Sequence, residues 1–329
     1  MTQRYAGDWR PGASLDVIKT RAALLKGVRA FFNQRDVLEV ETPLLGASFG
    51  TDPSIEPLES KFTGPGYPGG KRLFLQSSPE FFMKRLLATG SGPIYQVCKA
   101  FRNGEAGKRH NPEFTLLEWY RPGFSADQLM DEVASLICSL VNVPNLAVER
   151  LGYQSLFFDH LDLDPLEAEA SELCRCALDR NLLGAEGMQL DRDGWLDLLM
   201  TSFIEPELGR EGLTFVTDYP ATQASLARID PEDPRVAKRF ELYWKGLELA
   251  NGFEELADPD EQSERFEQEN CRRYSTGQKP MPVDDALLSA LEAGLPACSG
   301  VALGLDRLLM CQLDSADIEE VLGFSLARL

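Results

Sequence analysis

Residues 94–121 place the strongest constraint on the fold of this chain. The apolar segments IYQVCKAFR (94–102) and EFTLLEWYR (113–121) predict two strands, and the polar loop NGEAGKRHNP joins them. Further short strands alternate along the chain with helices of differing length. This arrangement favours an α+β fold in which an antiparallel sheet is flanked by helices.

Helical periodicity marks several other segments. Ser14 is a suitable residue to begin a helix, because apolar residues then recur every three or four positions until about Arg35. The other expected elements are helices at 78–88, 261–274 and 284–294, a strand that runs into a loop at 37–45, a strand at 214–220, short strand-like pieces within 46–70, a strand, turn and helix at 299–313, and a mostly helical, acidic stretch at 125–212.

Charge is unevenly distributed along the 329 residues. The net charge is −19, which argues against indiscriminate nucleic-acid binding and against attachment to an anionic membrane. Residues 151–212 carry 14 Asp and Glu against 4 Lys and Arg, a net charge of −10. Residues 61–121 carry 10 Lys and Arg against 4 Asp and Glu, a net charge of +6. A basic sector in an acidic chain favours an anionic ligand or partner, although chance clustering of solvated lysines would give the same count.

The chain also lacks the signals of secretion and of membrane insertion. It contains no run of 18 apolar residues, and its first ten residues lack the apolar stretch of a signal peptide. Its seven cysteines include no CxxC pair, which suits a reducing compartment, and two histidines are too few for a His-rich zinc site. We therefore expect a soluble, cytoplasmic protein.

The loop between the two strands at 94–121 is the first candidate site. Arg102 and Arg109 could hold a polyphosphate, and Phe114 offers an aromatic face on which a base can stack. An ordinary hairpin with a solvated, charged tip explains the same residues equally well.

Two further segments carry candidate chemistry. In SGVALGLDRLLM (299–310), glycines permit a close approach of the backbone to a ligand, and the helix that follows favours phosphate at its start, near Arg307. Glu241, Glu248 and Glu255 are spaced by seven, which on a helix would place them on one face. Such a face is usually solvated, but the apolar residues between these carboxylates indicate that they line a cavity, where they would suit Mg²⁺.

In this order, the segments resemble motifs 1, 2 and 3 of the class II aminoacyl-tRNA synthetases. Motif 1 corresponds to about 14–45 and includes Pro43, motif 2 to about 94–121, and motif 3 to about 299–313, with a helical insertion at about 125–212. The strings RHNPEFTLLEWY and LELANGFEEL are similar to the lysyl-tRNA synthetase branch. The resemblance implies a single catalytic domain over residues 1–329.

The short segment before the motif 1 helix indicates which kind of lysyl-tRNA synthetase-like protein the chain resembles. Only about 13 residues precede the motif 1 helix, too few for the OB-fold that grips an anticodon, so we expect no anticodon-binding domain. The chain is therefore similar to stand-alone lysyl-tRNA synthetase-like paralogues that modify elongation factor P. These activate (R)-β-lysine with ATP and transfer it to a lysine side chain of the factor. The resemblance also implies a homodimer and no stable binding of tRNA.

The resemblance assigns roles to individual residues. Arg102 would stabilise the transition state at the α-phosphate, Arg109 would hold the terminal phosphate, and Arg307 would sandwich the adenine with Phe114. Arg102 and Arg307 are thus the catalytic candidates. The full set expected to bind ATP is Arg102, Asn103, Gly104, Glu105, Arg109, Asn111, Phe114, Glu248, Leu249, Gly304 and Arg307. Glu241 and Glu248 would hold Mg²⁺. The residues expected to bind the amino acid are Ser78, Pro79, Glu80, Glu118, Tyr120, Asn251, Glu255 and Ala302.

Two positions depart from the family pattern. Gly104 stands where many members have Glu, so either Glu105 substitutes for that residue or the nucleotide contact comes from the backbone. Ala302 stands where lysyl-tRNA synthetases usually have Gly. Its methyl group would narrow the amino-acid pocket and could favour a β-amino acid, although simple packing also explains it.

Two alternatives to an elongation factor P ligase remain. One is a truncated lysyl-tRNA synthetase paralogue that charges tRNA or another acceptor, which the missing anticodon domain argues against. The other is a catalytically inactive, synthetase-like regulatory module, which the joint presence of Arg102, Glu248, Glu255 and Arg307 argues against. No covalent nucleophile is expected, and Cys98 and Cys298 are interpreted as core thiols.

Overall fold

The computed structural model describes residues 9–141, 143 and 146–329. The chain divides into two compact units, the first made of Met1–Phe124 and Ala257–Leu329 and the second of Ser125–Leu256. Each unit combines helices with mainly antiparallel strands, which confirms the α+β expectation. In the part of the chain described, no helix is long and apolar enough to cross a membrane.

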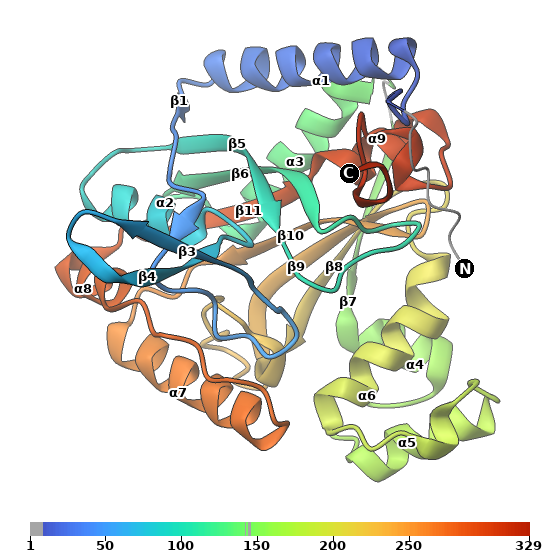
Figure 1. Ribbon diagram of the computed structural model, residues 1–329. Helices are drawn as coiled ribbons and strands as arrows, with labels where there is room; N and C mark the ends of the chain where they lie inside the picture. The colour runs from blue at the N-terminus through green and yellow to red at the C-terminus, as the bar shows by residue number, and fades with distance from the viewer. Residues whose placement is uncertain (1–8, 142, 144–145) are drawn as a thin grey trace. The chain divides into compact units, whose positions relative to one another are not determined.

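The first unit contains two sheets, shown with their helices in Figure 1. Strands β1, β5, β6 and β11 lie side by side in that order, and β2, β4 and β3 form a separate three-stranded sheet. Its elements are α1 (Leu15–Asn33), β1 (Leu38–Glu39), β2 (Leu45–Gly46), β3 (Leu58–Gly64), β4 (Tyr67–Leu75), α2 (Glu80–Ala88), β5 (Ile94–Phe101), β6 (Glu113–Pro122), α7 (Pro259–Ser275), α8 (Asp285–Gly294), β11 (Cys298–Gly304), α9 (Leu305–Leu313) and the 3-10 turns η5 (Ile318–Glu320) and η6 (Leu326–Arg328).

The second unit orders four strands as β10, β9, β8 and β7. Its elements are α3 (Ala126–Val141), β7 (Ala147–Gly152), α4 (Tyr153–Leu161), α5 (Ala170–Asp179), the 3-10 turn η1 (Ala185–Gly187), α6 (Arg192–Leu199), the π-helical turn η2 (Met200–Ile204), the 3-10 turn η3 (Glu205–Glu207), β8 (Gly212–Pro220), the 3-10 turn η4 (Ala221–Gln223), β9 (Val236–Trp244) and β10 (Leu247–Glu254).

Local sequence signals explain the elements that were predicted best. The Ser14 hydroxyl accepts a hydrogen bond from the Val17 N–H at 3.3 Å and so caps α1. The predicted hairpin is formed by β5 and β6, which pair antiparallel from Ile94 opposite Tyr120 to Phe101 opposite Glu113. Both predictions are confirmed.

Three predicted elements need correction. The segment 37–45, expected as a strand that runs into a loop, has a strand of only two residues, β1. The loop that follows includes Pro43, which cannot donate to a ladder, and the chain then enters a second short strand, β2. The helical stretch at 125–212 also contains a strand, β7, which pairs parallel with β8. The expected turn before the last long helix is absent, because α9 begins directly after Gly304.

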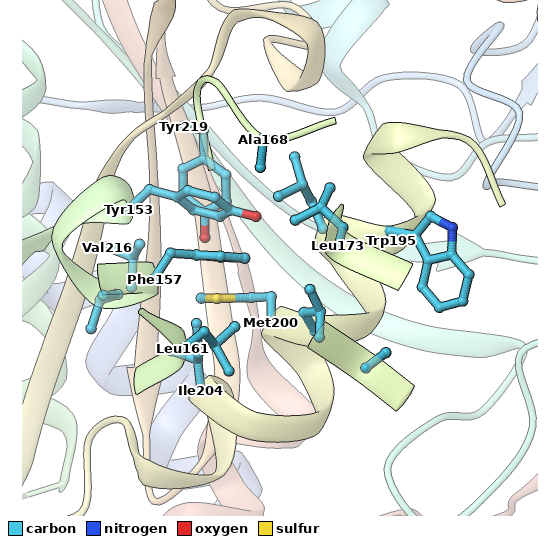
Figure 2. Close-up of a cluster of buried hydrophobic side chains, with 14 of the residues drawn as sticks. Tyr153, Phe157, Leu161, Ala168, Leu173, Trp195, Met200, Ile204, Val216 and Tyr219 are labelled. Carbon is cyan, nitrogen blue, oxygen red and sulfur yellow. The ribbon is translucent and has the colours of Figure 1, made fainter. Parts of the chain in front are cut away.

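The main core cluster of the second unit lies where α4, α5, α6 and η2 pack with β8. Figure 2 shows this cluster, in which the rings of Tyr153 and Tyr219 lie next to each other with centroids 4.8 Å apart. Phe157 stacks on Tyr153 at a centroid distance of 4.7 Å. The insertion therefore has its own apolar core, in which its helices pack against residues of β8 and β9.

Candidate active site

Arg102 lies one residue beyond β5, at the base of the loop that joins β5 to β6. Its N–H donates to the Pro112 carbonyl at 3.0 Å, and its guanidinium lies 5.2 Å from the centre of the Phe114 ring. The side-chain Nη1 is 3.6 Å from a Glu105 carboxylate oxygen, while Nε is buried and has no hydrogen-bond partner among the described residues. Arg102 is thus held in place with donor capacity left for an anion.

The residues after Arg102 adopt a conformation that only some side chains tolerate. Gly104 has φ +82°, in the left-handed region that favours glycine, and the space around it is open. A Glu at this position would therefore be strained. Glu105, by contrast, has its carboxylate beside Arg102, and the Asn103 N–H donates to the Glu56 carbonyl at 2.8 Å.

Arg307 lies on α9 and contacts the same loop. Its Nη2 is 2.6 Å from His110 Nε2, and its Nε donates to the Arg109 carbonyl at 3.4 Å. Because a guanidinium only donates, His110 must accept through an unprotonated Nε2. Burial and the neighbouring Arg307 charge lower the pKa of His110, which favours that neutral form. His110 was not among the predicted site residues, because its spacing from Arg307 in the sequence does not reveal that the two side chains meet.

Asn111 is a buried structural link. Its Nδ2 donates to the Glu113 carbonyl at 2.6 Å, and its Oδ1 accepts from the Leu326 N–H at 2.9 Å. Both ends of the amide therefore bind backbone groups and tie η6 to the β5–β6 hairpin. A direct contact between Asn111 and ATP stays a prediction.

Several residues expected to bind the amino acid are brought together around Glu118. Glu118 is 2% exposed, and its two oxygens accept from Ser78 Oγ at 2.9 Å and from the Tyr120 hydroxyl at 2.7 Å. Ser78 Oγ also accepts from the Glu80 N–H at 3.0 Å. Ala302 on β11 lies directly opposite Glu118 on β6. These five positions are therefore neighbours, and their binding of an amino acid stays a prediction.

Glu80 forms an ion pair that the sequence analysis did not predict. It lies in the first turn of α2, after Pro79, and is 2.7 Å from Lys84 Nζ. The Lys84 side chain is 1% exposed and that of Glu80 15%. The i, i+4 spacing on one helix was a usable signal for this pair.

A buried carboxylate joins the three motif-like segments of the first unit. Asp306, beside Arg307 on α9, is 2% exposed and accepts from the Thr115 N–H of β6 at 2.7 Å. Its other oxygen binds the Arg21 guanidinium of α1. Arg21 also donates to Thr115 Oγ1 and to the Val321 carbonyl, both at 3.3 Å. This network holds α1, β6 and α9 to one another and so fixes the helix that carries Arg307.

In the second unit, Glu241 and Glu248 lie on strands, not on the helix whose face their spacing suggested. β9 and β10 pair antiparallel, so Glu241 lies opposite Asn251 and Glu248 opposite Tyr243. The register shifts between Glu248 and Ala250, at the position of the buried Leu249. Glu255 follows β10 and is 6% exposed. The seven-residue spacing of these carboxylates therefore does not reflect a helical face.

Glu241 and Glu248 do line a cavity, as expected. The cavity has a volume of about 180 Å³. Its lining residues are Tyr153, Asp197, Met200, Thr201, Glu205, Tyr219, Gln223, Arg239, Glu241 and Glu248. The buried hydroxyl of Tyr153 has no hydrogen-bond partner among the described residues. Four carboxylates around one guanidinium make this an anionic cavity.

The carboxylates on the helical side of the cavity are hard to ionise. Burial, together with the charges of Glu241 and Glu248, raises the pKa of Glu205 to about 7. Burial raises the pKa of Asp197 to about 6, although the nearby Arg239 charge opposes the shift. The helical insertion thus supplies titratable groups to the cavity, which the sequence analysis did not predict.

Comparison with known proteins identifies the family. The sequence family described as tRNA synthetases class II (D, K and N) matches residues 1–328. The chain belongs to this family. It is also 49% identical over 320 residues, 97% of this chain and 98% of the relative, to an elongation factor P–(R)-β-lysine ligase of Klebsiella pneumoniae strain 342. A protein of the same name from Salmonella typhi is 48% identical over the same shares.

Membership of the class II tRNA synthetase family implies the use of ATP. Among the described residues, no three His, Cys, Asp or Glu side chains gather as a metal-ion site. Mg²⁺ that accompanies a nucleotide needs only one or two protein carboxylates, because phosphates and water supply the other ligands. Glu248 and Glu241 both line the anionic cavity and supply two such carboxylates. Their binding of Mg²⁺ stays a prediction.

The two cysteines interpreted as core thiols differ in burial. All seven are free thiols. Cys298 is buried, as expected of a core thiol, whereas Cys98 is only half-buried. Burial raises the pKa of Cys98 to about 12, so its thiol stays protonated at neutral pH.

Glu205→Gln is expected to make this class II synthetase more stable above pH 7. The native pKa of about 7 exceeds the ordinary value of 4.5, so the stability of the wild type falls as pH rises between these values. The variant should not lose this stability as the pH rises. It should therefore melt about 2–4 °C higher than the wild type at pH 8, a gain of about 1 kcal/mol in the free energy of unfolding. Thermal unfolding at pH 4.5 and pH 8 measures both effects. The control Glu207→Gln removes an exposed carboxylate paired with Arg210 and should show no such difference.

Proposed function

We propose that this chain is an ATP-dependent ligase that activates (R)-β-lysine as an adenylate and transfers it to the ε-amine of a lysine of elongation factor P. The observation that carries the proposal is the match to the elongation factor P–(R)-β-lysine ligase of Klebsiella pneumoniae strain 342. The match covers 97% of this chain and 98% of the relative. Retention of the residues expected for such a reaction supports it.

In the first step, a carboxylate oxygen of the amino acid attacks the α-phosphorus of ATP. An O–P bond forms, the bond to the β-phosphate oxygen breaks, and pyrophosphate leaves. Arg102 donates to the α-phosphate oxygens, where negative charge develops, and Arg109 and Arg307 bind the rest of the nucleotide. Glu241 and Glu248 would hold Mg²⁺, which when bound neutralises phosphate charge.

In the second step, the amine of the target lysine attacks the acyl carbon of the adenylate. The new amide forms as the bond to AMP breaks, and the amine gives up a proton. The buried thiols and the neutral His110 need not act as nucleophiles in either step.

Recognition of a dibasic amino acid requires negative side chains that are already desolvated. Glu118 and Glu255 are 2% and 6% exposed, and Glu80 is largely buried beside Lys84. An amino acid without the matching ammonium would offer these desolvated carboxylates no positive charge, so the site would discriminate strongly against it. The methyl group of Ala302, opposite Glu118, supports a preference for the β-isomer.

ATP–pyrophosphate exchange with (R)-β-lysine and with α-lysine tests the activation step. We expect fast exchange with the β-isomer and much slower exchange with the α-isomer. Incubation with ATP, the β-isomer and elongation factor P should add the mass of one lysyl group to the factor. No gain in mass with all three components present rejects the proposal. Acylation of bulk tRNA in a parallel reaction would instead support the tRNA-charging alternative.

We further propose that the enzyme acts in the cytoplasm as a homodimer. Free thiols at all seven cysteines suit a reducing compartment. The exposed Leu15 and Ile18, 71% and 38% accessible, give α1 an apolar strip that suits burial against a second copy. Stable binding of tRNA is not part of the proposal.

A further inference from the structure

Arg239 on β9 occupies an unusual electrostatic position. Among the described residues that line the cavity of the second unit, it alone carries a positive charge, and its side chain is 17% exposed. The guanidinium lies 4.5 Å from the centre of the Tyr219 ring, and Nη1 donates to the Gln223 carbonyl at 2.7 Å. The ring contact and the backbone hydrogen bond therefore both restrain the orientation of this largely buried cation.

The remaining donors of Arg239 reach two residues that are expected to bind ligands. Nη2 forms an ion pair with Oε1 of Glu241, the proposed Mg²⁺ ligand. Nε donates at 3.2 Å to Oδ1 of Asn251, which lies directly opposite Glu241 on β10. One planar guanidinium thus spans both strands, which a lysine ammonium on a single stem cannot do with the same geometry.

The contact with Asn251 determines which end of its amide is available. Because a guanidinium has donors only, the oxygen of the Asn251 amide must face Arg239. The NH₂ end is then left as a donor for an oxygen atom of a ligand. Without Arg239, the amide could rotate by half a turn and present its oxygen instead.

Glu241 does not depend on Arg239 alone. Its other oxygen, Oε2, accepts from the hydroxyls of Tyr219 and Tyr243, both at 2.6 Å. Loss of the guanidinium would therefore leave Glu241 hydrogen-bonded, while Asn251 would lose the contact that sets its direction. The stronger functional consequence falls on Asn251.

We propose that Arg239 is a positioning residue for the ligation reaction, which acts by fixing the amide of Asn251 so that its NH₂ group faces the ligand. The inference rests on the proposed function, since it takes Asn251 as part of the amino-acid site. Arg239 itself touches no ligand in this scheme.

Arg239→Lys tests the inference because it keeps the charge beside Glu241. We expect the KM for (R)-β-lysine in pyrophosphate exchange to rise about tenfold, with kcat changed less than about threefold. In an Asn251→Ala background the same substitution should change KM less than about twofold, because the residue through which it acts is gone. Equal effects in both backgrounds, or an unchanged KM in the single variant, would overturn the inference.

Two further measurements distinguish a failure of the inference from a loss of folding and from a failure of the proposed function. Arg235→Lys, at an exposed ion pair with Asp233 and Glu167, should leave KM unchanged. The side-chain NH₂ resonances of Asn251, identified by their loss in Asn251→Ala, should shift or broaden in Arg239→Lys. Unchanged resonances reject the inference whether or not the enzyme is active. Absence of exchange in the wild type rejects only the proposed function.

Discussion

Replacement of Arg102 with alanine is expected to lower kcat/KM for ATP–pyrophosphate exchange by about 10²–10³-fold, the usual cost of losing one preorganised donor at a developing negative charge. The side chain is held beside Phe114 and Glu105, and its buried Nε is free of protein partners among the described residues. It is thus already oriented before the nucleotide arrives. Steady-state exchange assays at saturating amino acid measure the effect.

Lys99→Ala provides the matched control for Arg102→Ala. Lys99 lies on β5, the strand that ends just before Arg102, is 43% exposed, and is 3.4 Å from Glu113 in a surface ion pair. Such pairs contribute about 0–1 kcal/mol, so neither stability nor exchange should change much. If Arg102→Ala and Lys99→Ala give the same activity, Arg102 has no role in adenylate formation.

Asp306→Ala is expected to destabilise the protein by about 3–5 kcal/mol, as is typical when one partner of a buried ion pair is removed. The substitution removes the carboxylate that pairs with the Arg21 guanidinium and accepts from the Thr115 N–H. It also releases α9 from β6, so exchange activity should fall through the displacement of Arg307. Urea denaturation followed by circular dichroism measures the loss of stability.

Two other variants show whether the buried position of Asp306 is responsible. Asp306→Asn keeps an acceptor for Thr115 and should cost less than the alanine variant. Asp16→Ala removes a carboxylate that is 90% exposed and pairs with Lys19 at 3.1 Å, and it should be nearly neutral. Equal stability of the Asp306 and Asp16 alanine variants would show that the network does not hold the three segments together.

Much of the first unit could be predicted because its signals are local. The cap at Ser14, the period of α1 and the apolar segments on either side of the loop at 103–112 specify α1, β5 and β6 from neighbouring residues alone. The segment 37–45 contains the expected loop, but its strand is only two residues long, because an apolar sequence becomes a strand only where a partner strand is available to it.

The second unit was harder to predict for a related reason. Glu241 and Glu248 are spaced as on a helical face, and nothing in their spacing reveals that they lie on two paired strands. The register of that pairing, and the helices that close the cavity, depend on residues far away in sequence. The raised pKa of Glu205 follows from that packing and has no local signal.

The sequence by itself determined the order of the three motif-like segments, the basic sector around Arg102 and hence the family, because these are properties of residue type and spacing along the chain. Only the tertiary structure decided the partners: Asp306 with Arg21, Arg307 with His110, and Arg239 with both Glu241 and Asn251. A charged side chain can meet any complementary group that folding brings within about 3 Å, and burial then decides how strongly the two interact. That choice depends on contacts between distant segments, which no local pattern records.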